Sequence, residues 1–217
     1  FSVITFSNSS KIDMPFTNDT DAVNNIIDSL DVMISMYAKG SSLNAPIKDM
    51  GYDLKNSAKD ISRKRIVFYI SDGEITNDEK LKSYSDLKKN VDGGAVLGYG
   101  TNKGGKMKVK KYSFSESKEY LEDNTQNTYP HPKAISKIDE ENLKQIAKDL
   151  GIEYVNMQKT SNVDKILKKI SRDISRDTQT FDVNTCNDTY YIFAIMLIMV
   201  LFFELINYKR RIAIWKR

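Results

Sequence analysis

The sequence predicts an α/β protein with a doubly wound, mostly parallel sheet, helices on both faces and one C-terminal transmembrane helix. Three observations support this prediction. The run 66–70 is apolar without alternation, as in a strand that is buried on both faces. Segments with strand and helix periodicity alternate along the chain, which is typical of parallel sheets. The segment 190–206 is apolar with a single charge, Glu204, which indicates a membrane span.

The first half of the predicted domain begins with a strand at 1–6. A helix that Asp19 or Thr20 can cap follows and ends at Gly40, and a second helix starts near Asn44. The apolar face of the first helix comprises Val23, Ile26, Ile27, Leu30, Met33 and Tyr37, and that of the second comprises Ile47, Met50, Leu54, Ala58 and Ile61.

The second half continues the alternation. The predicted elements are a strand at 65–71, a helix with Leu81, Tyr84, Leu87 and Val91 inward, a strand at 95–100, a helix from Asp139 to Gly151, a strand at 152–157 and a helix over 163–174. Residues 101–138 interrupt this order with a glycine pair and an alternating stretch, which is typical of a hairpin. Right-handed crossovers would bring the carboxyl ends of the parallel strands to one edge.

The chain divides into four predicted segments. They are a domain at 1–175, a polar linker at 176–189, a transmembrane helix at 190–208 that contacts the lipid bilayer, and a basic tail at 209–217. Five basic residues follow the span, whereas Asp182 and Asp188 precede it. The positive-inside rule therefore predicts a single-pass cell-membrane protein with its domain outside the cytoplasm and its C-terminus inside.

Charge argues against a nucleic-acid partner. The chain has 33 Lys and Arg and 29 Asp and Glu, and setting aside the five basic tail residues and Glu204 leaves 28 of each. A neutral soluble part lacks the basic excess that nucleic-acid-binding domains carry. The single cysteine, Cys186, excludes an intrachain disulfide, and the single histidine, His131, has no neighbouring histidine or cysteine in the sequence to form a site with.

Two loops with oxygen donors are expected at the carboxyl edge of the sheet. One is 71–74, with Asp72, and the other is 40–44, with Ser41 and Ser42. A carboxylate with hydroxyls suits Mg²⁺, Ca²⁺ or Mn²⁺ rather than zinc or copper. Two simpler interpretations stay open, because Asp-Gly is an ordinary turn dipeptide and the serines suit helix caps.

Six segments in this order resemble a von Willebrand factor type A domain. They are FSVITFS at 1–7, Pro15-Phe16-Thr17, KGSSL at 39–43, RIVFYISDGE at 65–74, LGYGTNKGG at 97–105 and SKIDEENLKQIAKDLGIEYV at 136–155. The last two resemble in particular the membrane-anchored Bat-type aerotolerance proteins of bacteria. The resemblance spans nearly all of residues 1–175.

The resemblance implies a metal-ion-dependent adhesion site and no enzymatic turnover. In the family, an Asp-x-Ser-x-Ser loop, a Thr and an Asp hold the cation, and a carboxylate from a partner protein completes its coordination. Asp72 matches the Asp, and Ser41 matches the Thr with its hydroxyl retained. The Asp-x-Ser-x-Ser loop would precede Phe1, so the chain is expected to be an N-terminally truncated piece of an envelope protein. Mg²⁺, or Mn²⁺ or Ca²⁺, is then expected only when the missing motif is present.

Three alternatives remain at this point. The loop 100–106 nearly spells a phosphate-binding loop of an NTPase, although Met107 replaces the expected hydroxyl and a strand pattern follows. Asp72 could instead serve phosphoryl transfer, which would need a basic clamp and further carboxylates. The third alternative is a structural, membrane-tethered domain whose metal site is vestigial.

Overall fold

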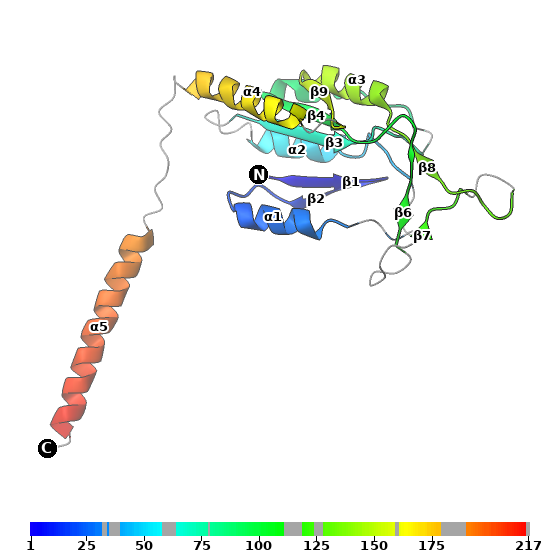
Figure 1. Cartoon of the computed structure of the whole chain (residues 1–217). Helices are drawn as coiled ribbons and strands as arrows, with labels where there is room; N and C mark the ends of the chain where they lie inside the picture. The colour runs from blue at the N-terminus through cyan, green and yellow to red at the C-terminus, as the bar shows by residue number, and fades with distance from the viewer. Residues whose placement is uncertain are drawn as a thin grey trace. The chain divides into compact units, whose positions relative to one another are not determined.

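The computed structural model describes residues 1–31, 34, 40–57, 64–77, 79–110, 119–123, 128–158, 161–178 and 190–215. The chain forms two compact units, Phe1–Gln179 and Thr180–Arg217 (Figure 1). Four side chains of the predicted helix faces lie outside the described residues, namely Met33, Tyr37, Ala58 and Ile61.

A three-stranded parallel sheet lies at the centre of the first unit. Strands β3 (Ile66–Ser71), β4 (Gly93–Gly98) and β9 (Glu153–Asn156) pair in the order β3-β4-β9. Both pairings are parallel and in regular register, with Tyr69 opposite Val96 and Val96 opposite Tyr154. The alternation of apolar segments therefore correctly predicted these three strands and their parallel direction.

The two faces of this sheet pack against different helices. On one face, Tyr69 and Val96 belong to a buried cluster with side chains of α2 (Ile47–Ser57) and α3 (Glu140–Leu150). On the other face, Ala95, Leu97 and Val155 pack against Ile166 of α4 (Ser161–Thr178). The larger cluster comprises Leu43, Met50, Leu54, Tyr69, Tyr84, Leu87, Val96, Ile138, Leu143, Ile146, Ala147 and Leu150.

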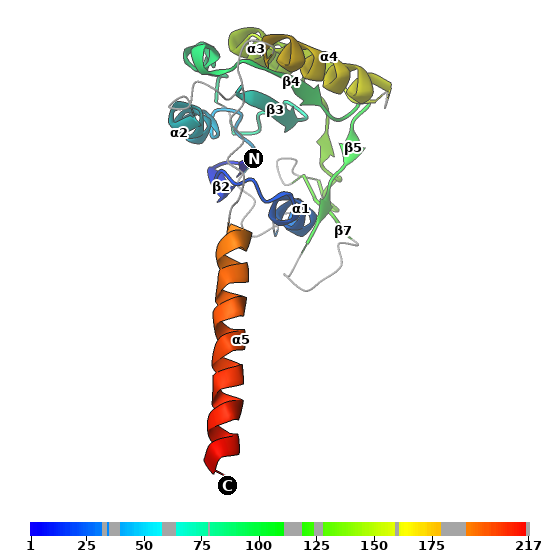
Figure 2. The same ribbon diagram turned by 90° about the vertical axis from the view of Figure 1, so that its left-hand side faces the viewer.

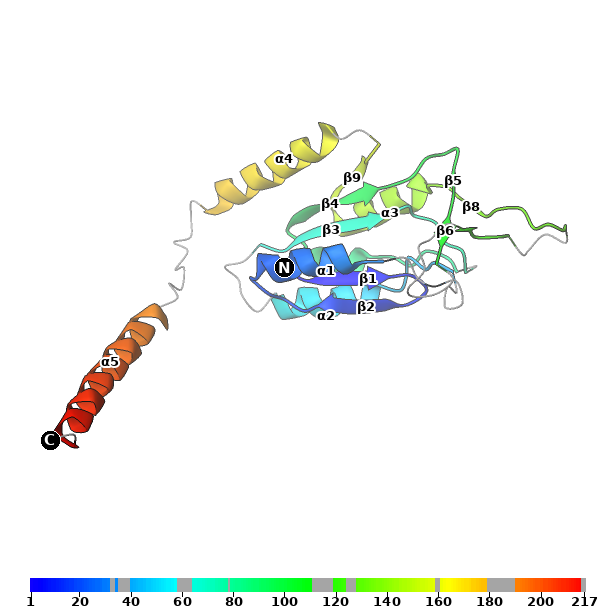
Figure 3. The same cartoon turned by 60° about the horizontal axis from the view of Figure 1, so that its bottom comes forward.

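The remaining strands form small antiparallel pairs. Strands β1 (Val3–Phe6) and β2 (Ser10–Met14) make a hairpin, and α1 (Thr20–Ser29), capped by Asp19, follows it (Figure 3). Between β4 and α3 the described residues 101–110, 119–123 and 128–136 lie outside the parallel sheet, and we call this part of the chain the excursion (Figure 2). Within it, β5 (Gly105–Lys106) pairs with β8 (Ile135–Ser136), and β6 (Lys108–Val109) pairs with β7 (Glu119–Tyr120).

The prediction of one doubly wound, mostly parallel sheet is wrong. Strand β1 pairs with β2 across a short loop and shares no sheet with β3. Side chains join the two sheets instead, since the rings of Phe6 and Tyr69 lie 5.3 Å apart. Nor is the apolar run of β3 buried on both faces, because Phe68 and Ile70 are 44% and 56% exposed. An apolar run identifies a strand, but it does not identify the strand's partners.

The predicted transmembrane helix at 190–208 is also contradicted. None of the helices, as far as the described residues go, combines the length and apolarity needed to cross a membrane. Helix α5 (Tyr190–Trp215) occupies this segment.

The helix predicted around Leu81 and Val91 is reduced to the short 3₁₀ helix η2 (Ser85–Asn90). Side chains from other segments accept hydrogen bonds from the backbone N–H groups that would have formed the first turns of the predicted helix. Asn44 Oδ1 accepts a hydrogen bond from Lys82 N at 2.7 Å, and Asp149 Oδ2 accepts one from Tyr84 N at 2.8 Å. Such side-chain partners compete with the backbone hydrogen bonds of a helix. The helical spacing of Leu81, Tyr84, Leu87 and Val91 therefore predicted a longer helix than the structure contains.

The core of α3 offers a test of this packing. Leu150 is 1% exposed, whereas Leu167 of α4 is 49% exposed. We expect Leu150→Ala to lower the free energy of unfolding by about 2–5 kcal/mol, because it removes buried contacts and leaves a cavity. Leu167→Ala should cost less than about 1 kcal/mol. Urea denaturation measures both, and equal costs would contradict the described burial.

An ionic clamp joins the starts of β3 and β4. Asp92 accepts hydrogen bonds from Arg65 N at 2.8 Å and Arg65 Nε at 2.9 Å, and Asp92 N donates to Arg65 O at 2.9 Å. The hydrogen-bonded Arg65 guanidinium lowers the pKa of the Asp92 carboxyl below its ordinary value. The Arg65–Asp92 pair therefore stabilises the folded state fully at pH values above the pKa that the Asp92 carboxyl has in the unfolded chain. This stabilisation is lost as the pH falls through the lower pKa of the same carboxyl in the folded chain.

This clamp gives a pH-dependent prediction. At pH 7, Asp92→Asn should lower the free energy of unfolding by about 1–3 kcal/mol, because a charge-assisted pair becomes a neutral one. The difference from wild type should begin to shrink as the pH falls below about 4, where Asp92 binds a proton in the unfolded chain, and should vanish once the folded carboxylate is protonated as well. Urea titrations at pH 7, 5 and 3 measure the difference, with the exposed Asp86→Asn as the control. A difference independent of pH would refute the ionic role.

Candidate functional site

The loop after β3 turns sharply through its own side chains. Ser71 Oγ accepts a hydrogen bond from Gly73 N at 3.0 Å, and Asp72 Oδ1 accepts one from Glu74 N at 3.1 Å. Gly73 has φ = 79°, and a Cβ at this position would overlap the carbonyl oxygen of Asp139 and the side chain of Leu143. The glycine is therefore required both by backbone conformation and by space.

The entry to α3 fixes this loop from the outside. Asp139 N donates to the carbonyl oxygen of Asp72 at 2.8 Å, and Asn142 Nδ2 donates to that of Gly73 at 3.0 Å. Asp139 also caps α3, because its Oδ1 accepts hydrogen bonds from the backbone of Glu141 and Asn142. The predicted N-cap at Asp139 is thus confirmed, and the same residue holds the predicted ligand loop.

Ser136 is a residue of this site that the sequence did not single out. It lies in β8, and its Oγ donates to Asp72 Oδ2 at 3.0 Å. The excursion therefore returns a hydroxyl to the end of β3. No sequence pattern marks Ser136, because its partner Asp72 lies 64 residues away in the chain.

The loop that carries Ser41 is attached to the segment after Asp72. Ser41 N donates to Thr76 Oγ1 at 2.7 Å, and Thr76 N donates to Ser41 O at 3.0 Å. These reciprocal bonds attach the 40–44 loop to Thr76, two residues after the 71–74 loop. The contacts described for this part of the chain do not include a hydrogen bond between Ser41 and Asp72 themselves.

Ser42 and Asn44 hold the same loop against residues 79–82. Ser42 Oγ and Asn44 Nδ2 donate to Glu79 Oε2 at 2.7 Å and 3.0 Å, and Asn44 Nδ2 also donates to Lys80 O at 2.9 Å. The Ser42 hydroxyl first, and the Asn44 amide next, lower the pKa of the Glu79 carboxyl. Ser42 is 3% exposed and is satisfied structurally, so it is not an available ligand.

Two buried tyrosines lie beneath both loops. The hydroxyls of Tyr69 and Tyr84 are 3.3 Å apart, and Tyr84 donates to the carbonyl oxygen of Leu43. Burial raises the pKa of each tyrosine, and for Tyr69 the nearby Tyr84 and Asp72 raise it further. Both hydroxyls are therefore neutral at physiological pH, and they connect the 40–44 loop to β3.

The donor set fits a hard divalent cation. Asp72 offers a carboxylate, and Ser41 and Ser136 offer hydroxyls on the surrounding loops; oxygen ligands of this kind suit Mg²⁺, Mn²⁺ or Ca²⁺. Over the described residues, no group of three or more His, Cys, Asp or Glu side chains could hold a metal ion. A site here would therefore depend on hydroxyls and on one carboxylate rather than on a carboxylate cluster.

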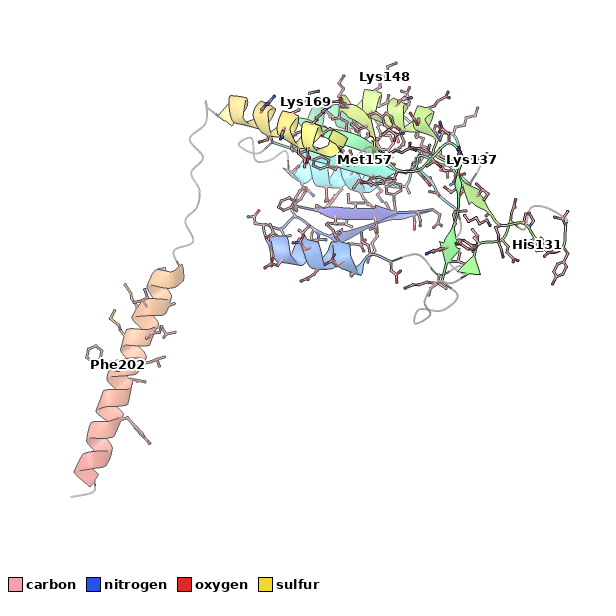
Figure 4. The ribbon with its side chains drawn as sticks, viewed as in Figure 1. His131, Lys137, Lys148, Met157, Lys169 and Phe202 are labelled. Carbon is pink, nitrogen blue, oxygen red and sulfur yellow. The ribbon has the colours of Figure 1, made fainter. Side chains whose placement is uncertain are left out.

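An open depression of about 620 Å³ lies beside this loop. Its rim carries both acidic and basic side chains, and Lys144 Nζ forms an ion pair with Glu140 Oε2 at 3.1 Å. Figure 4 shows Lys137 near the base of the excursion and His131 far out along it, so His131 takes no part in this site. The depression is lined by Glu74, Asn102, Lys137, Ile138, Asp139, Glu140, Glu141 and Lys144.

The loop 100–106 does not have the architecture of a phosphate-binding loop. Such a loop places its phosphate at the N-terminus of a helix. Here the strand β5 (Gly105–Lys106) stands where that helix would begin. The glycines serve a turn instead, since Gly104 has φ = 75° and its N–H donates to Thr101 O at 3.0 Å.

This chain resembles known proteins in its fold and not in its sequence. No family model and no curated protein sequence matches the chain. An aerotolerance-related membrane protein from Bacteroides fragilis NCTC 9343, carrying multiple mutations to serines, aligns over 79% of this chain and 78% of its own, with 17% identity and a TM-score of 0.58. The conserved hypothetical protein BatB from Bacteroides thetaiotaomicron aligns over 82% and 78%, with 19% identity and a TM-score of 0.56.

These two structures support the resemblance to Bat-type proteins that the sequence motifs indicated. Their identities, 17% and 19%, are low, so the likeness concerns the fold. The chain shares the fold of Bat-type aerotolerance-related proteins.

The Gly73 turn is testable with a matched pair of glycines. We expect Gly73→Ala to lower the free energy of unfolding by at least about 1–3 kcal/mol, because alanine is strained at φ = 79° and its Cβ overlaps Asp139. Gly105→Ala should change it by no more than about 0.5 kcal/mol, since nothing lies within 4 Å of the added Cβ. Thermal and urea unfolding measure both variants, and a neutral Gly73→Ala would refute the described turn.

Proposed function

We propose that residues 1–179 form a von Willebrand factor type A-like binding module that recognises a protein partner through a divalent cation at Asp72. One observation carries this proposal. Asp72 stands at the carboxyl end of β3, beside the Ser136 hydroxyl, and the loop with Ser41 is attached next to it through Thr76. Ligands of open α/β sheets bind at this edge.

The proposed chemistry is coordination without turnover. Mg²⁺ prefers six oxygen ligands and usually keeps several waters. Asp72 would supply the anionic ligand and Ser41 a neutral one, which leaves positions for water and for a carboxylate of the partner. One carboxylate does not neutralise a doubly charged cation, so the residual positive charge favours an anionic group. No bond is formed or broken in the bound molecules, and the proposed module is therefore not an enzyme.

The proposed setting is a bacterial membrane-associated protein. The structural neighbour from Bacteroides fragilis is described as an aerotolerance-related membrane protein, which supports this setting. The exposed face of the module would then meet a protein of the same envelope. A purely structural domain with a vestigial metal site is the competing proposal, and it predicts no response to divalent cations.

The cation proposal predicts stabilisation by Mg²⁺ or Mn²⁺. With few protein ligands, the affinity should lie at the weak, millimolar end of oxygen-ligand sites. A cation concentration ten times the dissociation constant then raises the free energy of unfolding by about 1.4 kcal/mol. Differential scanning calorimetry with and without cation measures this as an increase in Tm.

Asp72→Asn is the decisive variant, because it keeps the shape of the side chain and removes its charge. It should abolish the increase in Tm, whereas the exposed Asp86→Asn should retain it. Each variant is first measured without cation, so that a change in folding is separated from a change in binding. A wild-type Tm that ignores Mg²⁺ and Mn²⁺ would support the vestigial domain and refute the binding module.

A further inference from the structure

We propose that Ser136 is a further ligand of the cation at Asp72, supplied by the excursion. This inference rests on the function proposed above and adds a residue to its site. Ser136 is neither the counterpart of Ser41 nor part of the β3 loop. It comes from β8, which returns to the parallel sheet directly before α3.

The separation of the two oxygens carries the inference. Ser136 Oγ and Asp72 Oδ2 are 3.0 Å apart. Around an octahedral Mg²⁺ with metal–oxygen distances of about 2.1 Å, neighbouring ligand oxygens are also about 3.0 Å apart. The observed separation of the two oxygens thus equals that of two neighbouring ligands of such a cation.

The backbone around Ser136 holds this hydroxyl in place. Ser136 pairs with Gly105 across the β5-β8 ladder, and Ile138 is buried in the main core at 8% exposure. Gly104 approaches closely, because a Cβ there would lie 2.8 Å from Ser136 O. A ligand on a fixed backbone loses little conformational entropy when the cation binds.

The hydroxyl chemistry allows both states of the site. Without a cation, the Ser136 hydroxyl donates a hydrogen bond to Asp72 Oδ2. With a cation, a lone pair of the same oxygen faces the metal and the proton turns to water or to the partner's carboxylate. As a neutral ligand, Ser136 leaves the positive charge that attracts an anionic partner unchanged. The acidic rim residues Glu74, Glu140 and Glu141 oppose that attraction, and Lys137 favours it.

Paramagnetic Mn²⁺ provides a readout that works at weak affinity. In ¹H–¹⁵N spectra of the full 217-residue chain, Mn²⁺ should broaden the amide signals of Ser41, Gly73 and Lys137 first. Ser136→Ala should raise the Mn²⁺ concentration for half-maximal broadening by about 10-fold or more. Ser136→Thr keeps the hydroxyl and should behave like wild type, and the distant Ser85→Ala is the control.

The outcomes separate the two proposals. If Mn²⁺ leaves the 40–44 and 71–76 signals of the wild type unchanged, the proposed function and the ligand role of Ser136 are both wrong. If the wild type responds and Ser136→Ala responds at the same concentration, the function stands and Ser136 is not a ligand. Cation-free spectra and Tm values of each variant show whether it folds, and Ser136→Thr must restore the response if the hydroxyl is the active group.

Discussion

The contact between the β3 loop and the start of α3 is the constraint on which the rest of the site depends. Gly73 lies so close to Asp139 that only a glycine fits, and Asp139 N binds the carbonyl oxygen of Asp72 at 2.8 Å. Because Asp139 is also the N-cap of α3, the helix cannot move without moving the loop. This shared residue fixes the backbone at Asp72, whose carboxylate accepts hydrogen bonds from Glu74 N and Ser136 Oγ. Ser136 is placed by the chain that leads into the same cap.

Packing explains how small, separate sheets can support such a site. The main core joins the hairpin, the parallel sheet and helices α2 and α3 through side chains, with the Phe6–Tyr69 ring contact between the two sheets. The tyrosine pair extends this core toward the 40–44 loop, where Tyr84 binds the carbonyl oxygen of Leu43. The 40–44 loop therefore rests on a buried, neutral tyrosine pair as well as on the Glu79 carboxylate.

The sequence predicted several local features and the parallel strands of the central sheet, whereas it missed the β1-β2 hairpin and the side-chain contacts between distant segments. The β3 run, the Asp139 cap and the Gly151 stop follow from neighbouring residues, and all three are present. The loss of helix around Leu81 depends on residues far away in the sequence, namely Asn44 and Asp149. The hairpin of β1 and β2 is local, but an apolar run such as 1–6 does not show which strand pairs with it. Asp72 was identifiable because it ends a strand, but Ser136 reaches it across 64 residues, and no sequence period encodes that distance.

Anomalous diffraction from crystals of this chain soaked in Mn²⁺ tests the central claim most directly, because it locates the cation. The account predicts a peak at about 2.1–2.2 Å from both Asp72 Oδ2 and Ser136 Oγ, on the side open to solvent. A peak among Glu140 and Glu141 instead, or no ordered peak at the end of β3, would contradict it.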